Sequence, residues 1–127
     1  VGYEWSAFTP EVLRKAHMEG RHVVVDFTAR WCLNCQYNKV MVLRDRAIVS
    51  LMEQKNVVAL RADLTGDNPA AQALLEHLGS RSVPFVAIFP GDDPYHPIIM
   101  RDVLGKSRLK KALKDLAERW EEGGMVK

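Results

Sequence analysis

Two cysteines, Cys32 and Cys35, are the residues of this chain whose type and spacing best suit chemistry. The segment before them, residues 22–28 (HVVVDFT), is β-branched and almost entirely apolar, as expected of a strand that is covered on both faces. After Trp31 the apolar residues recur with the period of a helix, which is predicted to run to about Leu43. The cysteine pair therefore lies where a buried strand ends and a helix begins.

This position suits thiol chemistry because the reactive species in disulfide exchange is the thiolate. A free thiol has a pKa near 8.5, so only about 3% of it is ionised at pH 7. Half ionisation needs a shift of about 1.5 pKa units, or roughly 2 kcal/mol, which the unpaired N–H groups and the dipole of a helix N-terminus can supply. Cys32 lies at this end of the predicted helix, and Cys35 lies one turn deeper. We therefore predict that Cys32 attacks a disulfide and that Cys35 resolves the mixed disulfide.

Other uses of the two cysteines remain open. A structural disulfide would close a short loop and contribute about 2 kcal/mol in the chain-entropy model, so it would be a weak staple. A zinc site usually has four ligands, and the histidines that would complete one show no paired spacing. These histidines are His17, His22, His77 and His96. A carrier of a soft ion such as Cu(I) and a pair of unrelated core cysteines are further alternatives, but we expect no metal and no organic cofactor.

Asp26 lies inside the apolar strand, six residues before the first cysteine. Burial disfavours the charged form of a carboxyl group, so the pKa of Asp26 should be raised. A carboxyl group of this kind suits proton transfer to or from Cys35. A hydrogen-bonded, purely structural Asp26 is the alternative. Trp31 either packs beside the cysteine pair or belongs to the core, where we also place Phe27 and Phe85.

Strands and helices alternate along the rest of the chain. At two places an N-cap residue is followed by proline, and the last helix has apolar residues three or four apart. The predicted elements are a helix from Thr9 to Gly20, a helix capped by Asp45, a strand at 57–64, a helix from Asn68 to Gly79, strands at 84–89 and 98–104, and a helix capped by Ser107 that reaches Trp120. This order predicts an α/β fold with a mixed sheet, to which the last two strands contribute an antiparallel pair.

The length and composition of the chain set further limits. Its 127 residues are predicted to form a single domain, with an ordered core at about 6–120 and a tail at 121–127. Apolar residues make up 47% and charged residues 27%, which excludes disordered and fibrous proteins. The net charge of +2 gives no reason to expect a nucleic-acid partner, and the basic residues at 106–114 fit a solvated helix face.

Membrane and targeting segments are not predicted in this chain. The longest apolar stretch, residues 83–89, is far shorter than the roughly 20 residues of a membrane-spanning helix. The chain opens with Val1 and shows no charged-then-apolar leader. We therefore expect a mature form or a domain of a longer protein.

Two segments carry a resemblance to a known family. They are residues 23–35 (VVVDFTARWCLNC) and residues 60–85 (LRADLTGDNPAAQALLEHLGSRSVPF). The first contains the W-C-x-x-C motif and resembles thioredoxin-fold proteins in general. The second, with its LTxxD-like stretch, its ALLxHL helix and its spacing to a proline, resembles the C-terminal periplasmic domain of DsbD-type thiol:disulfide interchange proteins. The resemblance runs from about Ser6 to Trp120 and implies a thioredoxin-like fold, a central mixed sheet flanked by helices on both faces.

The resemblance also implies roles for single residues. Cys32 and Cys35 would pass electrons to a disulfide of another protein, and Asp26 would exchange a proton with Cys35. Pro84 matches the family's cis-proline, which lies opposite the cysteine pair. Val83 would then offer its backbone N–H and C=O to an incoming peptide as a short β-bridge.

The resemblance implies protein partners. DsbD-type domains take electrons from a membrane-embedded cysteine pair and hand them to a second periplasmic domain, from which they reach disulfide isomerases and cytochrome c maturation proteins. We therefore expect the partners to be cysteine pairs of other redox proteins, docking on a moderately apolar surface that includes Trp31, Leu33 and Val83. We expect a monomer in the periplasm, with the cytoplasm as the alternative location.

Some positions depart from the related families. Leu33-Asn34 stands where thioredoxins usually have Gly-Pro, and Val40 stands where they have a further proline. Lys39 stands where DsbD-type domains often have an acid. A cation that points inward lowers the pKa of a thiol, and Arg30 adds positive charge nearby. We therefore predict that the first cysteine ionises more readily than is usual in the family.

The leading hypothesis is a protein-disulfide reductase that acts through Cys32 and Cys35. Within the enzyme class, the alternative is a free-standing thioredoxin-like reductase or oxidant. Outside it, the alternative is a redox-inert binding module that keeps the thioredoxin fold for protein contacts. The sequence does not fix the direction of electron flow, because about 30 mV of reduction potential already corresponds to 1.4 kcal/mol for this couple.

Overall fold

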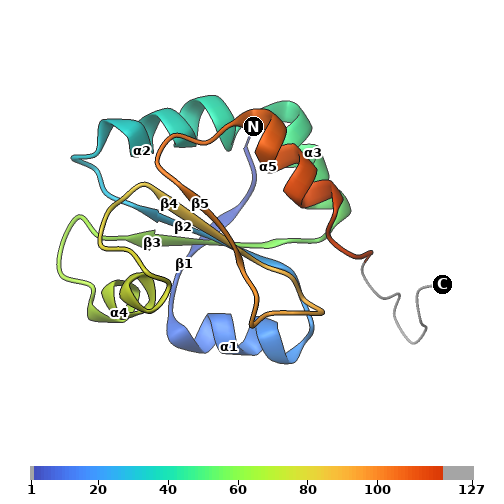
Figure 1. The fold of residues 1–127 in the computed structure, drawn as a ribbon, viewed down its shortest axis with the longest axis horizontal. Helices are drawn as coiled ribbons and strands as arrows, with labels where there is room; N and C mark the ends of the chain where they lie inside the picture. The colour runs from blue at the N-terminus through green and yellow to red at the C-terminus, as the bar shows by residue number, and fades with distance from the viewer. Residues whose placement is uncertain (1, 119–127) are drawn as a thin grey trace.

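The computed structural model describes residues 2–118, with a five-stranded mixed β-sheet at the centre (Figure 1). The strands are β1 (Trp5–Ala7), β2 (Val23–Thr28), β3 (Val58–Asp63), β4 (Phe85–Phe89) and β5 (Ile98–Arg101). Their order in the sheet is β1-β3-β2-β4-β5. β3 pairs parallel with β1 and β2, whereas β4 pairs antiparallel with β2 and β5. The predicted α/β fold with a mixed sheet is confirmed.

Helices cover both faces of this sheet (Figure 1). On one face lie α1 (Pro10–Met18) and α4 (Pro69–His77). On the other lie α2 (Leu33–Tyr37), the π-helical turn η1 (Asn38–Val42), α3 (Arg46–Gln54) and α5 (Lys106–Lys114). Within residues 2–118, none of these helices has the length and apolarity needed to cross a lipid bilayer.

The sheet separates two apolar clusters, and β2 contributes to both. Side chains alternate along a strand, so Val25 and Phe27 enter the cluster that includes residues of α1 and α4, whereas Val24 enters the cluster that includes residues of α3 and α5. Phe27 packs edge-on against Phe85 with ring centroids 5.6 Å apart, which confirms both as core residues. Asp26 follows Val24 by two residues and therefore faces the side of the sheet that carries α2 and α3.

Three helix starts confirm the predicted caps. Thr9 Oγ1 and Asn68 Oδ1 each accept a hydrogen bond from the N–H three residues on, at 3.1 and 3.3 Å. Asp45 Oδ2 accepts from two N–H groups in the first turn of α3. The predicted cap Ser107 is wrong: Gly105 is the N-cap residue of α5, with an extended backbone and no side-chain hydrogen bond, and Ser107 lies inside the first turn.

Other elements differ from the sequence expectation. The helix predicted to reach Leu43 changes from α2 to the π-turn η1, which buries Asn38 completely. β5 ends at Arg101 because the next residue, Asp102, has a left-handed backbone with φ 63°. β1 was not predicted, since a three-residue strand is too short to show an alternating pattern. The last helix was expected to reach Trp120, but α5 ends at Lys114 with Asp115 as its C-cap residue, and residues 115–118 are not helical. The predicted tail lies outside the described residues.

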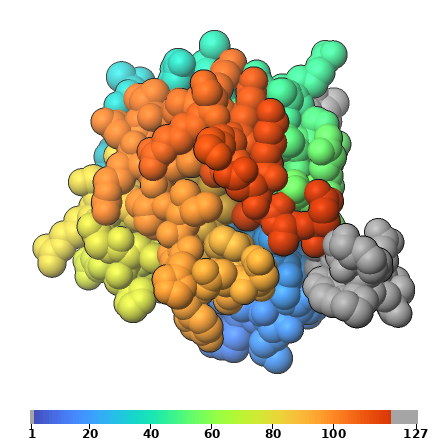
Figure 2. Space-filling view, turned by 45° about the vertical axis from the view of Figure 1, so that its right-hand side comes forward, coloured from blue at the N-terminus to red at the C-terminus, as the bar shows by residue number. Residues whose placement is uncertain are grey.

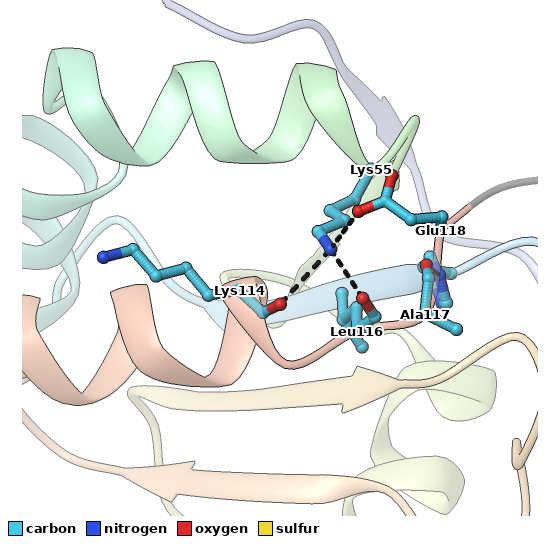
Figure 3. A network of polar contacts seen from close by, with 6 residues as sticks. Lys55, Lys114, Leu116, Ala117 and Glu118 are labelled. Atoms are coloured by element: carbon cyan, nitrogen blue, oxygen red, sulfur yellow. Dashed lines mark hydrogen bonds and ion pairs between the residues drawn. The ribbon is translucent and has the colours of Figure 1, made fainter.

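Lys55 holds the end of α5 against the end of α3 (Figure 3). Its Nζ donates to the backbone carbonyl oxygens of Lys114 at 3.2 Å and Leu116 at 2.6 Å. It also pairs with Glu118 Oε2 at 3.0 Å. The last carbonyl groups of a helix have no intrahelical partner, so this buried ammonium group satisfies acceptors that the fold would otherwise leave unpaired.

His22 joins two further segments at the same end of the molecule. Its Nδ1 accepts from the N–H of Gly91 at 2.8 Å, and its Nε2 lies 2.6 Å from the carbonyl oxygen of Ala117, to which it donates in this tautomer. Gly91 follows β4 and lies so close to Gly20 that a Cβ atom at this position would overlap the Gly20 carbonyl. The connection between β4 and β5 therefore lies against the end of α1 (Figure 2).

Candidate active site

Cys32 and Cys35 lie at the start of α2, shortly after the carboxyl end of β2. Cys32 is the N-cap residue of the helix, and its Sγ accepts a hydrogen bond from the N–H of Cys35 at 3.1 Å. The two sulfur atoms form a disulfide, with Cα atoms 5.2 Å apart. The predicted strand-to-helix junction is confirmed. An N–H of the first turn is directed at the Cys32 sulfur, where it would also stabilise a thiolate.

The two cysteines differ in access. Cys32 retains 8% of its surface and Cys35 only 1%. On either side of Cys32 the chain is open to solvent, since Trp31 is 68% and Leu33 84% exposed. This geometry agrees with the predicted division of labour, in which a partner meets Cys32 and Cys35 stays shielded.

The segment before β4 lies opposite the first cysteine. The carbonyl oxygen of Val83 is 3.8 Å from Cys32 Sγ, although the two residues are 51 positions apart in the sequence. The Val83–Pro84 peptide bond is cis, as the resemblance implied. Val83 is half-buried and packs against the cluster of Ala29, Cys32 and Cys35, whereas Pro84 is buried. The structure therefore brings together Cys32, Cys35, Val83 and Pro84.

Asp26 is buried on the strand that leads to the cysteine pair, with 2% of its side chain exposed. Burial raises the pKa of its carboxyl group from 3.8 to about 6. Two cations oppose this shift: Arg61, whose Nε lies 3.5 Å from Asp26 Oδ2, and Lys39. Among the described residues, Asp26 Oδ2 accepts no hydrogen bond, because the Arg61 contact is too long for a good one. The carboxyl group can therefore gain or lose a proton near neutral pH.

Arg61 is a site residue that the sequence analysis missed. It lies on β3 directly beside Asp26, with which it is in register, and its guanidinium group also lies over the Trp5 ring at 4.5 Å from the ring centroid. The signal in the sequence is a single arginine inside the apolar strand VVALRADL. Lys39 is half-buried, and its positive charge lowers the pKa of the buried Asp26 carboxyl group.

Exposed apolar side chains flank the cysteine pair in the chain. Trp31 is 68% exposed, so the alternative that it belongs to the core is wrong, whereas its role in docking stays a prediction. Leu33 is 84% exposed, and α2 and η1 carry further exposed apolar side chains. These are Tyr37, Val40 and Met41.

Three of the four histidines considered as zinc ligands make other contacts. His22 is hydrogen-bonded at the far end of the molecule, His17 packs on Phe89 with ring centroids 5.3 Å apart, and His96 pairs with Asp93 at 2.7 Å. In the described part of the chain, no three His, Cys, Asp or Glu side chains are arranged to hold a metal ion.

Comparison with known proteins agrees with this geometry. A family model described as thioredoxin-like matches residues 4–91. The thiol:disulfide interchange protein DsbD 1 of Pseudomonas aeruginosa is 27% identical over 122 residues, which cover 91% of this chain and 20% of that protein. The thiol:disulfide interchange protein DsbD of Ralstonia nicotianae is 30% identical over 88 residues, which cover 69% of this chain and 14% of that protein. The chain thus spans about a fifth or less of the length of these relatives.

Solved structures show the same fold. The oxidised C-terminal domain of DsbD from Neisseria meningitidis superposes with a TM-score of 0.69 at 18% sequence identity, covering 90% of this chain and all of that one (100%). A thioredoxin from Thermus thermophilus superposes with a TM-score of 0.66 at 23% identity, covering 90% of this chain and 86% of that one. At these identities the superpositions speak for the fold alone.

Proposed function

The chain belongs to the thioredoxin-like family, and from this membership and the geometry of its cysteine pair we propose that it is a protein thiol:disulfide oxidoreductase that acts as a disulfide reductase. One observation carries the proposal: the disulfide lies at a helix start, and the sulfur of Cys32, the less buried of the two cysteines, lies 3.8 Å from the Val83 carbonyl oxygen. A structural staple needs neither an accessible sulfur nor a backbone segment beside it.

The reaction that fits this geometry has two exchange steps. In the reduced protein the Cys32 thiolate attacks one sulfur of a partner disulfide, an intermolecular S–S bond forms, and the other partner sulfur leaves as a thiolate. The Cys35 thiolate then attacks the Cys32 sulfur, which restores the Cys32–Cys35 disulfide and releases the second partner thiol. Two electrons pass to the partner, and the pair ends in the oxidised form described above.

Asp26 supplies the proton transfer that the second step needs. Cys35 must lose its proton before it can attack, and it lies in a nearly dry environment where a thiol ionises reluctantly. A carboxyl group with a pKa of about 6 is mostly ionised at pH 7 and can take up that proton. Lys39 and Arg61 keep the carboxylate available by lowering its pKa against the effect of burial.

We further propose that the partners are cysteine pairs of other redox proteins and that the domain works in the periplasm. The name of the relatives, thiol:disulfide interchange protein, supports protein disulfides as substrates. The exposed apolar side chains of Trp31 and Leu33 beside the cysteines support docking of a protein rather than binding of a small molecule. No further cofactor is needed, because the cysteine pair itself carries the electrons.

Reduction of insulin by dithiothreitol tests the activity. We expect the protein to accelerate it and Cys32→Ser to abolish the acceleration, because the attacking sulfur is gone. Cys35→Ser should instead accumulate a mixed disulfide with the substrate, visible as a band on a non-reducing gel, since nothing resolves it. A wild-type protein without any acceleration would refute the proposal and leave the redox-inert binding module.

The direction of electron flow needs a separate measurement. Equilibration of the Cys32–Cys35 couple with a glutathione buffer gives its reduction potential. A value near that of thioredoxin, about −270 mV, or below it supports a reductase, whereas one near the −120 mV of a strong oxidant would reverse the assignment.

A further inference from the structure

The segment between β5 and α5 contains a residue with a left-handed backbone. Asp102 has φ 63°, in the left-handed region that non-glycine residues rarely adopt. Strain of this kind persists where surrounding contacts hold the residue, and it is concentrated at functional sites. The contacts of Asp102 are therefore informative.

Three hydrogen bonds join Asp102 to the two halves of the candidate active site. Its N–H donates to the carbonyl oxygen of Pro84 at 3.0 Å. Its own carbonyl oxygen accepts from Asn38 Nδ2 at 3.1 Å. Its carboxylate Oδ1 accepts from Asn34 Nδ2 at 3.0 Å. Asn34 lies between the two cysteines, so Asp102 binds the helix that carries the sulfur atoms on one side and the Val83–Pro84 segment on the other.

Asn38 fixes the same segment at a second point. It is completely buried in the π-turn η1, and its Oδ1 accepts from the N–H of Leu104 at 2.9 Å. Its amide group therefore donates to one end of residues 102–104 and accepts from the other. An interior amide in this arrangement is costly to disturb, because each lost partner leaves a buried polar group unpaired.

We propose that Asp102 is a positioning residue for disulfide exchange. The hydrogen bonds among Asn34, Asn38, Asp102 and Pro84, which we call the Asp102 latch, set the position of the Val83 backbone relative to the Cys32 sulfur. This inference rests on the proposed function. Both Cys32 and Val83 lie beyond the ends of their strands, where no ladder hydrogen bond fixes their spacing, and the latch supplies a direct link there.

The latch should matter only for substrates that use both of its sides. A protein disulfide must meet the sulfur of Cys32 and lie along the backbone of Val83 at the same time, so its reaction depends on their spacing. A small alkylating reagent needs the sulfur alone. Loss of the latch should therefore separate these two reactions, which a general loss of folding would not do.

The test compares Asp102→Ala, Asp102→Gly and Asp102→Asn with the wild type. For the Ala and Gly variants we expect kcat/KM toward insulin to fall about tenfold, while alkylation of reduced Cys32 by iodoacetamide changes less than about twofold. The Gly variant is the sharper of the two, because glycine adopts the left-handed backbone without strain, so the variant removes the hydrogen bond from Asn34 Nδ2 to the Asp102 carboxylate and keeps the local backbone conformation favourable. Asp102→Asn should keep most of the activity, since an amide oxygen still accepts from Asn34 and asparagine tolerates a left-handed backbone.

Two further variants complete the design. Asn34→Ala should cause the same selective loss of insulin reduction. The double variant with Asp102→Ala should lose little more, because both substitutions remove the same hydrogen bond, the one from Asn34 Nδ2 to Asp102 Oδ1. Asn56→Ala is the matched control: Asn56 also has a left-handed backbone, φ 53°, but it lies between α3 and β3 and bonds to Arg21. It should leave both reactions unchanged.

Several results would overturn the latch. Wild-type kcat/KM in Asp102→Gly, an equal loss of insulin reduction and alkylation, or a loss in Asp102→Asn as large as in Asp102→Ala would each do so. Hydrogen exchange separates this failure from failure of the proposed function. The amide of Leu104 should exchange faster in Asn34→Ala than in the wild type whether or not the wild type reduces insulin, and an unchanged rate would mean that the latch does not hold the segment.

Discussion

Two buried charged side chains, Asp26 and Lys55, differ in how well their hydrogen-bonding groups are satisfied. Lys55 is 7% exposed and reaches three oxygen acceptors at 2.6 to 3.2 Å. Asp26 is 2% exposed, and its Oδ2 has one cation at 3.5 Å and, within residues 2–118, no hydrogen-bond donor. A buried charge that has its hydrogen-bond partners stabilises the contact between the segments that supply them. A buried carboxylate that lacks a donor has a raised pKa, so it takes up and releases a proton near neutral pH.

The two side chains lie in different parts of the molecule. The Lys55 end joins the termini of α3 and α5 and contains no group proposed for the reaction. The Asp26 face leads to the cysteine pair and the Asp102 latch. We therefore expect substitutions of Lys55 and of Asp26 to change stability and activity in different combinations.

Asp26→Asn should give the largest effect on stability, and with an unusual sign. The pKa of Asp26 rises from 3.8 to about 6 on folding, so the folded oxidised protein binds more protons than the unfolded chain between these values, and its stability falls as pH rises through that window. The substitution should remove this cost and raise the free energy of unfolding at pH 7 by up to about 3 kcal/mol. Urea denaturation at pH 4 and pH 7 measures it.

The same variant should lose activity while it gains stability. Without the carboxylate, resolution of the mixed disulfide should slow by about 10²-fold, the usual contribution of a positioned general base. Asp63→Asn is the control. Hydrogen bonds from Thr65 lower the pKa of Asp63, so the stability that Asp63 contributes is lost as pH falls, and removing it should lower the stability at pH 7. A loss of stability in Asp26→Asn at pH 7 would contradict the raised pKa of Asp26.

Lys55→Met should show the opposite combination. Methionine keeps most of the side-chain volume but leaves the carbonyl groups of Lys114 and Leu116 without their donor, so the free energy of unfolding should fall by about 2 kcal/mol. Insulin reduction and the reduction potential should stay at wild-type values. Lys111→Met, which removes an exposed ion pair with Asp115, should cost less than about 0.5 kcal/mol. A changed potential in Lys55→Met would contradict the separation of the two ends.

The smallest effect concerns the charges around the reactive sulfur. We expect the alkylation rate of reduced Cys32 to inflect below the ordinary thiol value of about pH 8.5, because of the helix start and the cations Lys39 and Arg30. Lys39→Met should move the inflection upward and raise the pKa of Asp26, whose carboxylate Lys39 stabilises. An inflection well above pH 8.5 in the wild type would refute the predicted activation.

The parts of the fold that local rules govern could be predicted from the sequence. The caps Thr9, Asp45 and Asn68 were recognised because a cap uses residues within one turn. The buried strand β2 was recognised from its uniformly apolar composition. β1 was missed because a three-residue strand is defined by its neighbour β3 rather than by its own pattern. The cap of α5 was misplaced because serine is also tolerated inside a first turn.

The residues of the candidate site also differ in whether a short segment of sequence is enough to recognise them. The cysteine spacing and the acid in an apolar strand are properties of short segments, so Cys32, Cys35 and Asp26 were identified directly. Arg61 was missed because only the register of β2 against β3 places it beside Asp26. Pro84 was recognised through the family resemblance, since periodicity alone marks it only as the start of a strand.

Short stretches of sequence were enough to identify the groups proposed to react: a thiol at a helix start and a carboxyl group inside an apolar strand, both recognised from a few neighbouring residues. Which groups lie opposite the helix that carries the cysteines depends on the tertiary structure. The Val83 carbonyl lies 51 positions from Cys32, and the Asp102 carboxylate lies 68 positions from Asn34. Contacts of such separation depend on how strands pair and where loops turn back, and each of them is the joint outcome of the whole packed sheet rather than of any one segment.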